Sequence, residues 1–512
     1  MTALPVTGAA RTGVATRLIA FLTVYFALQA LLRLLAASSL GLDDAEMVVI
    51  SQALQPGYGS QPPLYNWLQV GAFSIFGFGA GAIVILHFVL LWAVYILVFL
   101  SARIVLADEV KAAAVSLALF AIPQIGWEAL HSHTHTLLSL TLAALTLFAM
   151  LRVLQNGRWR NYLALGVCFA LGALAKYSYI PFAAALLVAA VTIPGLRGRV
   201  LSVRMVAAIV LALILLAPHL TWVWTHLAET LSRTSKFKID ADTGLLMAWG
   251  RGLVAMLVGV AGYVGLSLVV FAAATFLPIR GGRDTTVPAE PIRTGVPHGR
   301  AFILRVLLVA LGIVLVAVLA SRATEVKERW LQPILFLLPL ALMILVEPRL
   351  NRLREAFLIA ISAGIGIILM AAMAVGYLLP DLHGGPFRAT APFAALADDI
   401  HRLGFDQGYV LAADHYIAGN LGLHLPGSVV AEPEYGLWPL AAGEKPAPVL
   451  LAWPGGRERP PKALRALFAQ LCGPDALGEP AVTPLSEPYE HASEQRYELA
   501  VALVPECPAA TP

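Results

Sequence analysis

Three carboxylates lie within four residues of one another in the N-terminal part of the chain: Asp43, Asp44 and Glu46. The flanking segment 37–79 contains no Lys or Arg, so it offers these groups no basic partner. Crowded carboxylates repel each other and raise one another's pKa, and a carboxyl group with a raised pKa is a good general base. The cluster could take the proton of a substrate hydroxyl or bind a cation. Acidic residues that only cap a helix would also explain it.

A second polar cluster follows at Glu128, His131, His133 and His135. If this stretch is helical, Glu128, His131 and His135 share one helix face, and their side chains are suitable ligands for a divalent metal. The cofactor expected from this cluster is therefore a divalent metal ion. A polar turn whose imidazoles face water or lipid head groups is the alternative.

The composition decides which elements must position these groups. The chain has 512 residues, of which 59% are hydrophobic and only 13% are charged, whereas soluble domains carry about 25% charged residues. A bilayer can cover so much apolar surface, so we predict an α-helical polytopic membrane protein with about eleven transmembrane helices. The expected spans are 18–36, 80–104, 112–127, 135–152, 161–175, 178–194, 202–220, 252–278, 302–320, 331–346 and 356–378.

The basic residues predict the orientation of this bundle. They lie mostly in alternate short loops, which places the N-terminus in the cytoplasm and the region after the last span outside. Few basic residues are then expected on the outer side, and these are Arg33, Lys176, Arg233, Lys236, Lys238, Arg251, Arg322, Lys327 and Arg329. Because cations are scarce there, they are candidates for binding an anionic group, although basic side chains also extend to lipid head groups without further function.

After a membrane domain of residues 1–379, residues 380–512 are predicted to form a periplasmic, water-soluble α/β domain. Apolar runs at 409–412, 449–452 and 499–504 predict strands, and residues 395–403 and 461–471 predict amphipathic helices. A disulfide between Cys472 and Cys507 is compatible with a domain outside the cytoplasm. No catalytic motif occurs in this domain, and we expect it to stabilise the outer mouth of the membrane domain.

Three short motifs accompany the acidic pair. They are residues 62–68 (Pro-Pro-Leu-Tyr-Asn-Trp-Leu), 172–176 (Gly-Ala-Leu-Ala-Lys) and 328–333 (Glu-Arg-Trp-Leu-Gln-Pro). Their order along the chain resembles that of the GT-C glycosyltransferases of the protein-mannosyltransferase and aminoarabinose-transferase type, family 39 and its relatives. The resemblance covers most of residues 15–380 and the C-terminal domain only loosely.

The resemblance implies an inverting enzyme that moves a sugar from a polyprenyl-phosphate donor to a lipid, glycan or protein acceptor. The reaction would take place at the periplasmic face of the bacterial inner membrane. Asp43 would be the general base, and Asp44 and Glu46 would position it, bind the acceptor or hold a metal. The residues expected to bind substrate or its phosphate are Lys176, Arg329, Lys327, Arg322, Gln61, Tyr58 and Tyr65. Gln61 stands where many relatives have a Lys, so this position supplies no charge to a phosphate.

A transporter or flippase of a lipid-linked or small polar substrate is the alternative function. Such a protein needs polar or charged residues deep within its spans, often in broken helices. In this sequence the ionisable residues gather at the ends of the expected spans, which favours catalysis at the membrane interface. A non-catalytic scaffold would leave the three clustered carboxylates unexplained.

Overall fold

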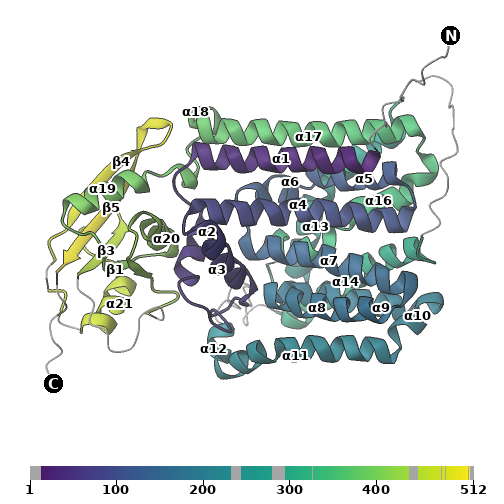
Figure 1. The fold of residues 1–512 in the computed structure, drawn as a ribbon, viewed down its shortest axis with the longest axis horizontal. Coiled ribbons are helices and arrows are strands. Elements are labelled where there is room, and N and C mark those ends of the chain that lie inside the picture. Colours follow the sequence, from purple (N-terminus) through teal and green to yellow (C-terminus); the bar gives the residue numbers. More distant parts are fainter. Residues whose placement is uncertain are drawn as a thin grey trace, which may run out of the picture.

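The computed structural model describes residues 13–231, 244–278, 295–325, 327–437, 448–473, 476–478, 480–505 and 507. A bundle of helices, with a sheet domain at one of its ends, makes up this part of the chain (Figure 1). Eight of its helices are long and apolar enough to cross a membrane. They are α1 (Val14–Ala36), α4 (Ala80–Leu106), α7 (Thr134–Asn156), α11 (Val203–Thr225), α13 (Leu245–Phe276), α14 (Gly299–Ser321), α17 (Arg352–Leu378), and the segment Gln332–Arg349 with α15 (Gln332–Leu335) and α16 (Leu338–Val346).

The other three predicted spans also fall on helices, but these are bent or short. The segment Glu109–Ala121, with α5 (Glu109–Leu117), is bent by 83° against Pro123–Leu130, which begins with α6 (Pro123–Gly126). Pro123 lacks a backbone N–H and therefore interrupts the helix. α8 (Trp159–Ala175) and α9 (Ile180–Val191) are two shorter helices on either side of Lys176. All eleven predicted spans thus fall on apolar helices of the described residues: eight are long enough to cross a membrane by themselves, the bent pair makes a ninth, and α8 and α9 are shorter.

The outer surface of the bundle is apolar. Leu213 and Ile214 on α11 and Val254 and Leu257 on α13 are all exposed although their side chains are large and hydrophobic. Contiguous surfaces of this kind are costly in water and are covered by lipid in a bilayer. The predicted class, a multi-pass α-helical membrane protein, is therefore confirmed.

Two helices of the loop between α1 and α4 lie at the same end of the bundle as the sheet domain (Figure 1). They are α2 (Leu42–Ile50) and α3 (Leu64–Phe76). α2 follows Gly41, which has an extended backbone, and its first turn contains Asp43 and Asp44. Carboxylates are favourable there because the N-terminus of a helix carries partial positive charge. This loop therefore holds the acidic residues at the junction of the two parts.

The sheet domain has five strands in the order β2-β1-β3-β5-β4. β1 (Tyr409–Ala412), β2 (Val429–Ala431) and β3 (Val449–Pro454) are parallel, and β5 (Ala492–Val504) runs antiparallel to both β3 and β4 (Thr483–Tyr489). α19 (Phe393–Arg402), α20 (His415–His424) and α21 (Lys462–Cys472) belong to this domain, and Cys472 forms a disulfide with Cys507. The three predicted strands and both predicted helices are confirmed, whereas the sequence analysis missed β2, β4 and α20. The remaining short helices are α10 (Pro194–Val200), α12 (Leu227–Thr230) and α18 (Pro380–His383).

Candidate active site

Asp43 lies against the loop that precedes α7. Its Oδ2 accepts a hydrogen bond of 2.8 Å from the backbone N–H of His133. His133 has a left-handed backbone with φ 79°, which a histidine adopts only rarely. This turn aims the N–H at Asp43 and therefore connects the two polar clusters of the sequence.

Two of the predicted cations act on the same histidine. Burial lowers the pKa of His133 to about 4; the Asp43 carboxylate opposes this shift, while Lys176 and Arg329 add to it. Charges influence a pKa in this way only when they lie near the group. Asp43, Lys176 and Arg329 thus lie within electrostatic reach of His133, and we call these four residues the Asp43 side.

Neighbouring polar groups hold the two cations in place. Lys176 follows the last turn of α8, and its ammonium group donates a hydrogen bond to the Thr136 hydroxyl on α7. Arg329 lies in the 3-10 turn Glu328–Trp330, and Gln124 donates a side-chain hydrogen bond to Glu328 in that turn. Two distant parts of the chain therefore bring two positive charges within electrostatic reach of His133.

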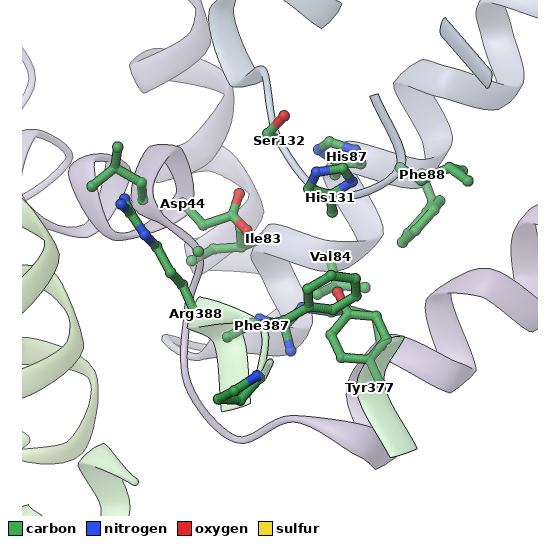
Figure 2. A pocket seen from close by; sticks show the side chains of 16 residues that line it. Asp44, Ile83, Val84, His87, Phe88, His131, Ser132, Tyr377, Phe387 and Arg388 are labelled. Atoms are coloured by element: carbon green, nitrogen blue, oxygen red, sulfur yellow. The ribbon is translucent and has the colours of Figure 1, made fainter. Parts of the chain in front are cut away.

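Asp44 faces a different space from its neighbour. It lines a cavity of about 310 Å³, which we call the Asp44 pocket (Figure 2). The polar and charged side chains of the pocket are Arg33, Asp44, His87, His131, Ser132, Tyr377 and Arg388. Figure 2 shows Asp44 facing the same space as His87 and His131, with the rings of Tyr377 and Phe387 along another side. The pocket thus offers donors, one carboxylate and aromatic surface to a polar ligand.

The charges in this pocket are partly balanced. Burial raises the pKa of Asp44, and His87 and Arg33 counteract this by favouring the ionised carboxylate. Arg33 at the end of α1 is itself buried, and its guanidinium donates to the carbonyl oxygens of Ala37 (2.9 Å) and Ser39. Burial lowers the pKa of His131, while Glu128 opposes that shift. At neutral pH His131 is therefore a neutral hydrogen-bonding group.

Three further predicted residues, Glu46, Tyr58 and Gln61, contact other parts of the protein in or near the loop between α1 and α4. The buried carboxylate of Glu46 accepts a hydrogen bond from the Tyr435 hydroxyl. The Tyr58 hydroxyl donates to the Ala53 carbonyl oxygen (2.7 Å), and Tyr58 and Gln61 form an isolated β-bridge. Tyr58 thus closes a turn of its own loop, and its predicted role in binding substrate or phosphate stays a prediction. Gln61 is half-buried beside that turn.

Tyr65 is the exception among these loop residues. It is fully buried, with its ring centroid 5.4 Å from that of His135. Burial raises its pKa well above the usual value, and Asp44 and Asp43 raise it further. The phenol is therefore neutral and close to both carboxylates.

The predicted metal site is not formed. Glu128–Leu130 is a 3-10 turn and α7 begins only at Thr134, so the left-handed His133 breaks the helix that the prediction required. His131 Nε2 lies 3.9 Å from a Glu128 oxygen, whereas His135 packs on Tyr65. Among the described residues no three His, Cys, Asp or Glu side chains are grouped to hold a metal ion.

The other predicted cations lie away from the Asp44 pocket. Arg322 ends α14 and is exposed, and Lys327 precedes the turn that carries Arg329; among the described residues neither lines the pocket. Arg233, Lys236 and Lys238 lie outside the described residues.

Two residues that line the Asp44 pocket, His87 and Arg388, were not predicted. His87 lies within the long apolar helix α4, and Arg388 belongs to a segment without a motif.

Comparisons with known proteins agree with this arrangement. A family model described as dolichyl-phosphate-mannose-protein mannosyltransferase matches residues 60–222. The lipopolysaccharide core galacturonosyltransferase RgtA of Rhizobium johnstonii is 33% identical over 446 residues, which cover 85% of this chain and 86% of the relative. RgtB of the same organism, also a lipopolysaccharide core galacturonosyltransferase, is 32% identical over 498 residues, or 95% of this chain and 97% of the relative.

The chain belongs to the GT-C family of membrane glycosyltransferases. This assignment confirms the resemblance that the acidic pair and the three motifs indicated, and it favours transfer chemistry over the transporter alternative.

A solved GT-C structure has the same fold. ArnT from Cupriavidus metallidurans bound to undecaprenyl phosphate superimposes with a TM-score of 0.54 at 15% identity, covering 96% of this chain and 98% of that chain. The match includes the sheet domain, because it extends over nearly the whole of both chains. The membrane bundle with a C-terminal sheet domain is therefore the shared architecture of these two glycosyltransferases.

Proposed function

We propose that this glycosyltransferase moves galacturonic acid from a polyprenyl-phosphate donor to the core of lipopolysaccharide. Two relatives of 33% and 32% identity are named lipopolysaccharide core galacturonosyltransferases. The solved ArnT neighbour is bound to undecaprenyl phosphate, which supports a carrier of the same chemical class for this chain. The observation that carries the proposal is the hydrogen bond from the His133 backbone N–H to Asp43 at one end of the bundle, with Lys176 and Arg329 within electrostatic reach of the same His133.

In this proposal Asp43 is the general base. An acceptor hydroxyl attacks the anomeric carbon of the sugar while its proton passes to the Asp43 carboxylate. The bond between the anomeric carbon and the phosphate oxygen breaks, and the polyprenyl phosphate leaves with the bonding electrons. Attack from the side opposite the phosphate inverts the configuration at that carbon.

Lys176 and Arg329 would stabilise the leaving phosphate. Negative charge develops on the leaving oxygen, and preorganised positive groups lower the free energy of such a transition state. The planar guanidinium of Arg329 suits a phosphate particularly well because it can donate two parallel hydrogen bonds. The donor would therefore occupy the Asp43 side.

The acceptor would enter from the Asp44 pocket. Its lining combines Arg388 and Arg33 with Asp44, Ser132 and aromatic rings, a mixture that suits a hydroxylated acceptor bearing negative charge. Asp44 would hold an acceptor hydroxyl, and α2 would separate the two substrates until they meet at Asp43.

The same proposal assigns the orientation. For this activity we place the protein in the inner membrane, with the acidic end of the bundle facing the periplasm and the N-terminus in the cytoplasm. The disulfide of Cys472 and Cys507 in the sheet domain supports this, because disulfides persist in oxidising compartments.

The experiment is sugar transfer by the purified protein in proteoliposomes. Polyprenyl-phosphate galacturonic acid with a labelled sugar is the donor, and lipopolysaccharide core is the acceptor. Wild type should transfer the label, and Asp43→Asn should lower kcat by about 10²–10⁴-fold, because a neutral amide cannot accept the proton. Asp381→Asn, which alters an exposed carboxylate of α18, is the control and should match wild type.

Each outcome decides a separate part of the proposal. Transfer of a different polyprenyl-phosphate-linked sugar by wild type would show that galacturonic acid is the wrong sugar. Undiminished transfer by Asp43→Asn would remove Asp43 from the role of base.

A further inference from the structure

α2 packs on the sheet domain as closely as on the membrane bundle. One continuous hydrophobic cluster joins Ala45 and Val48 of α2 to Ile417 and Leu421 of α20. The approach is tight at Gly419, where an added Cβ would come within 2.1 Å of the Ala45 carbonyl oxygen. The acidic helix is thus part of the core of the C-terminal domain.

Two side-chain amides fasten both ends of this helix to the domain. Asn420 on α20 accepts a hydrogen bond of 2.7 Å from the backbone N–H of Leu40, just before α2. After α2, the Gln52 amide accepts from the Val430 N–H (2.9 Å) and donates to the Val430 carbonyl oxygen (2.8 Å). Val430 lies in β2, the edge strand, so Gln52 pairs with it as a further strand would.

A turn after β2 contacts Glu46, the third carboxylate of the acidic cluster on α2. The buried Glu432 carboxylate accepts hydrogen bonds from the backbone N–H groups of Glu434 (2.9 Å) and Tyr435 (3.1 Å). The chain closes the turn with a bond of 2.8 Å from the Gly436 N–H to the Glu432 carbonyl oxygen. This fixed turn places the Tyr435 hydroxyl on the Glu46 carboxylate.

Glu46 follows Asp43 by three residues on α2. Residues at this spacing lie on the same face of a helix, one turn apart. The hydrogen bond from Tyr435 restrains the Glu46 side chain, and it therefore restrains the rotation of α2 about its own axis. That rotation sets the direction in which Asp43 points.

We propose that the C-terminal domain is part of the catalytic machinery, because its Tyr435 positions Asp43 through the hydrogen bond to Glu46. Tyr435 and Glu46 are positioning residues in this account, and neither needs to touch a substrate. The inference rests on the proposed role of Asp43 as the base. It also assigns to Glu46 a role different from that of the two Asp residues.

The test is Tyr435→Phe, which removes one hydroxyl and keeps the ring. We expect kcat for sugar transfer to fall about 10-fold, because small misplacements of a reacting group cost much of its effect. KM for donor and acceptor should stay within about 2-fold and the melting temperature within about 2 °C of wild type, because neither substrate nor core is altered. Glu46→Gln, which keeps a hydrogen-bond acceptor for Tyr435, should lose less activity than Glu46→Ala.

The matched control is Tyr162→Phe. Tyr162 is also buried and donates a hydrogen bond of 2.7 Å to a backbone carbonyl oxygen, that of Arg199. It lies on α8, and its removal should leave kcat unchanged. Equal loss of kcat in Tyr435→Phe and Tyr162→Phe would overturn the proposal, as would full activity of Tyr435→Phe.

A second measurement does not depend on the substrate. Hydrogen–deuterium exchange of residues 42–50 should be faster in Tyr435→Phe than in wild type and unchanged in Tyr162→Phe. Unchanged exchange in Tyr435→Phe would overturn the positioning role even if wild type used another donor. Faster exchange together with inactivity of wild type on every donor would instead contradict the proposed function.

Discussion

Asp43 and Asp44 are adjacent in the sequence, yet they face two different regions of the molecule. Asp43 accepts a hydrogen bond from the backbone N–H of His133, on which the charges of Lys176 and Arg329 also act. Asp44 faces a pocket whose lining comes from the bundle and from the segment that leads into the C-terminal domain. Successive residues of an α-helix point about 100° apart, so one short helix can serve both regions.

Under the proposed function, this difference would let one acidic helix separate two substrates. The Asp43 side is rich in positive charge and suits the leaving phosphate of a donor. The Asp44 pocket has mixed charge and aromatic walls, which suit a hydroxylated acceptor. Changes on the Asp43 side should therefore affect donor use, and changes in the Asp44 pocket should affect acceptor use.

The largest effect beyond the base itself is expected from Arg329→Gln. This change removes a charged hydrogen-bond donor from the Asp43 side, and kcat/KM for the donor should fall roughly 100-fold, in line with about 1.5–3 kcal/mol for such a bond. Initial rates at varied donor and saturating acceptor measure it. Arg251→Gln, at an exposed arginine of α13, is the control; an equal loss there would mean that general surface charge, and not the Asp43 side, binds the donor.

A smaller effect is expected from Arg388→Gln. Arg388 is an exposed residue at the edge of the Asp44 pocket, and KM for lipopolysaccharide core should rise about 5-fold, since an exposed charged contact contributes up to about 1 kcal/mol. KM for the donor should not change. A rise in KM for the donor alone would reverse the assignment of the two regions. Arg402→Gln, at an exposed arginine of α19, serves as the control.

The smallest effect concerns the stability of the Asp43 side. The pKa of His133 is lowered from 6.5 to about 4, so the folded protein keeps this ring neutral while the unfolded chain binds a proton below about pH 6.5. Stability from this group is complete above pH 6.5 and is lost as the pH falls towards 4. His133→Asn removes the titration and keeps a residue that tolerates positive φ, so its melting temperature should fall less between pH 7.5 and pH 5 than that of wild type.

Between pH 7.5 and pH 5, wild type should lose about 1–2 kcal/mol more unfolding free energy than His133→Asn, which corresponds to a few degrees of melting temperature. Thermal unfolding in detergent at the two pH values measures it. His298→Asn is the matched control, because His298 also has a positive φ of 56° but is exposed. A pH dependence that His133→Asn leaves unaltered would show that other groups cause the acid instability.

Much of the fold could be predicted from the sequence because its signals are local. Long apolar runs determine membrane helices wherever they occur, and the eleven expected spans all fall on helices. The strands at 409–412 and 449–454 follow from short apolar runs in the same way. Hydropathy does not predict the bend of 83° at Pro123, because the break depends on a missing backbone N–H and not on the apolar character of the segment.

The candidate site likewise has features that the sequence predicts and features that only the fold creates. The sequence by itself determined the cluster of acidic residues Asp43, Asp44 and Glu46 and the absence of Lys and Arg from residues 37–79, because charge and composition need no coordinates. Only the tertiary structure decided that Asp43 shares His133 with Lys176 and Arg329, that Arg388 reaches the Asp44 pocket, and that Tyr435 holds Glu46. These contacts join residues that are far apart in the chain. Conversely, Asp43 and Asp44 are adjacent in the sequence, but α2 directs their side chains to different faces.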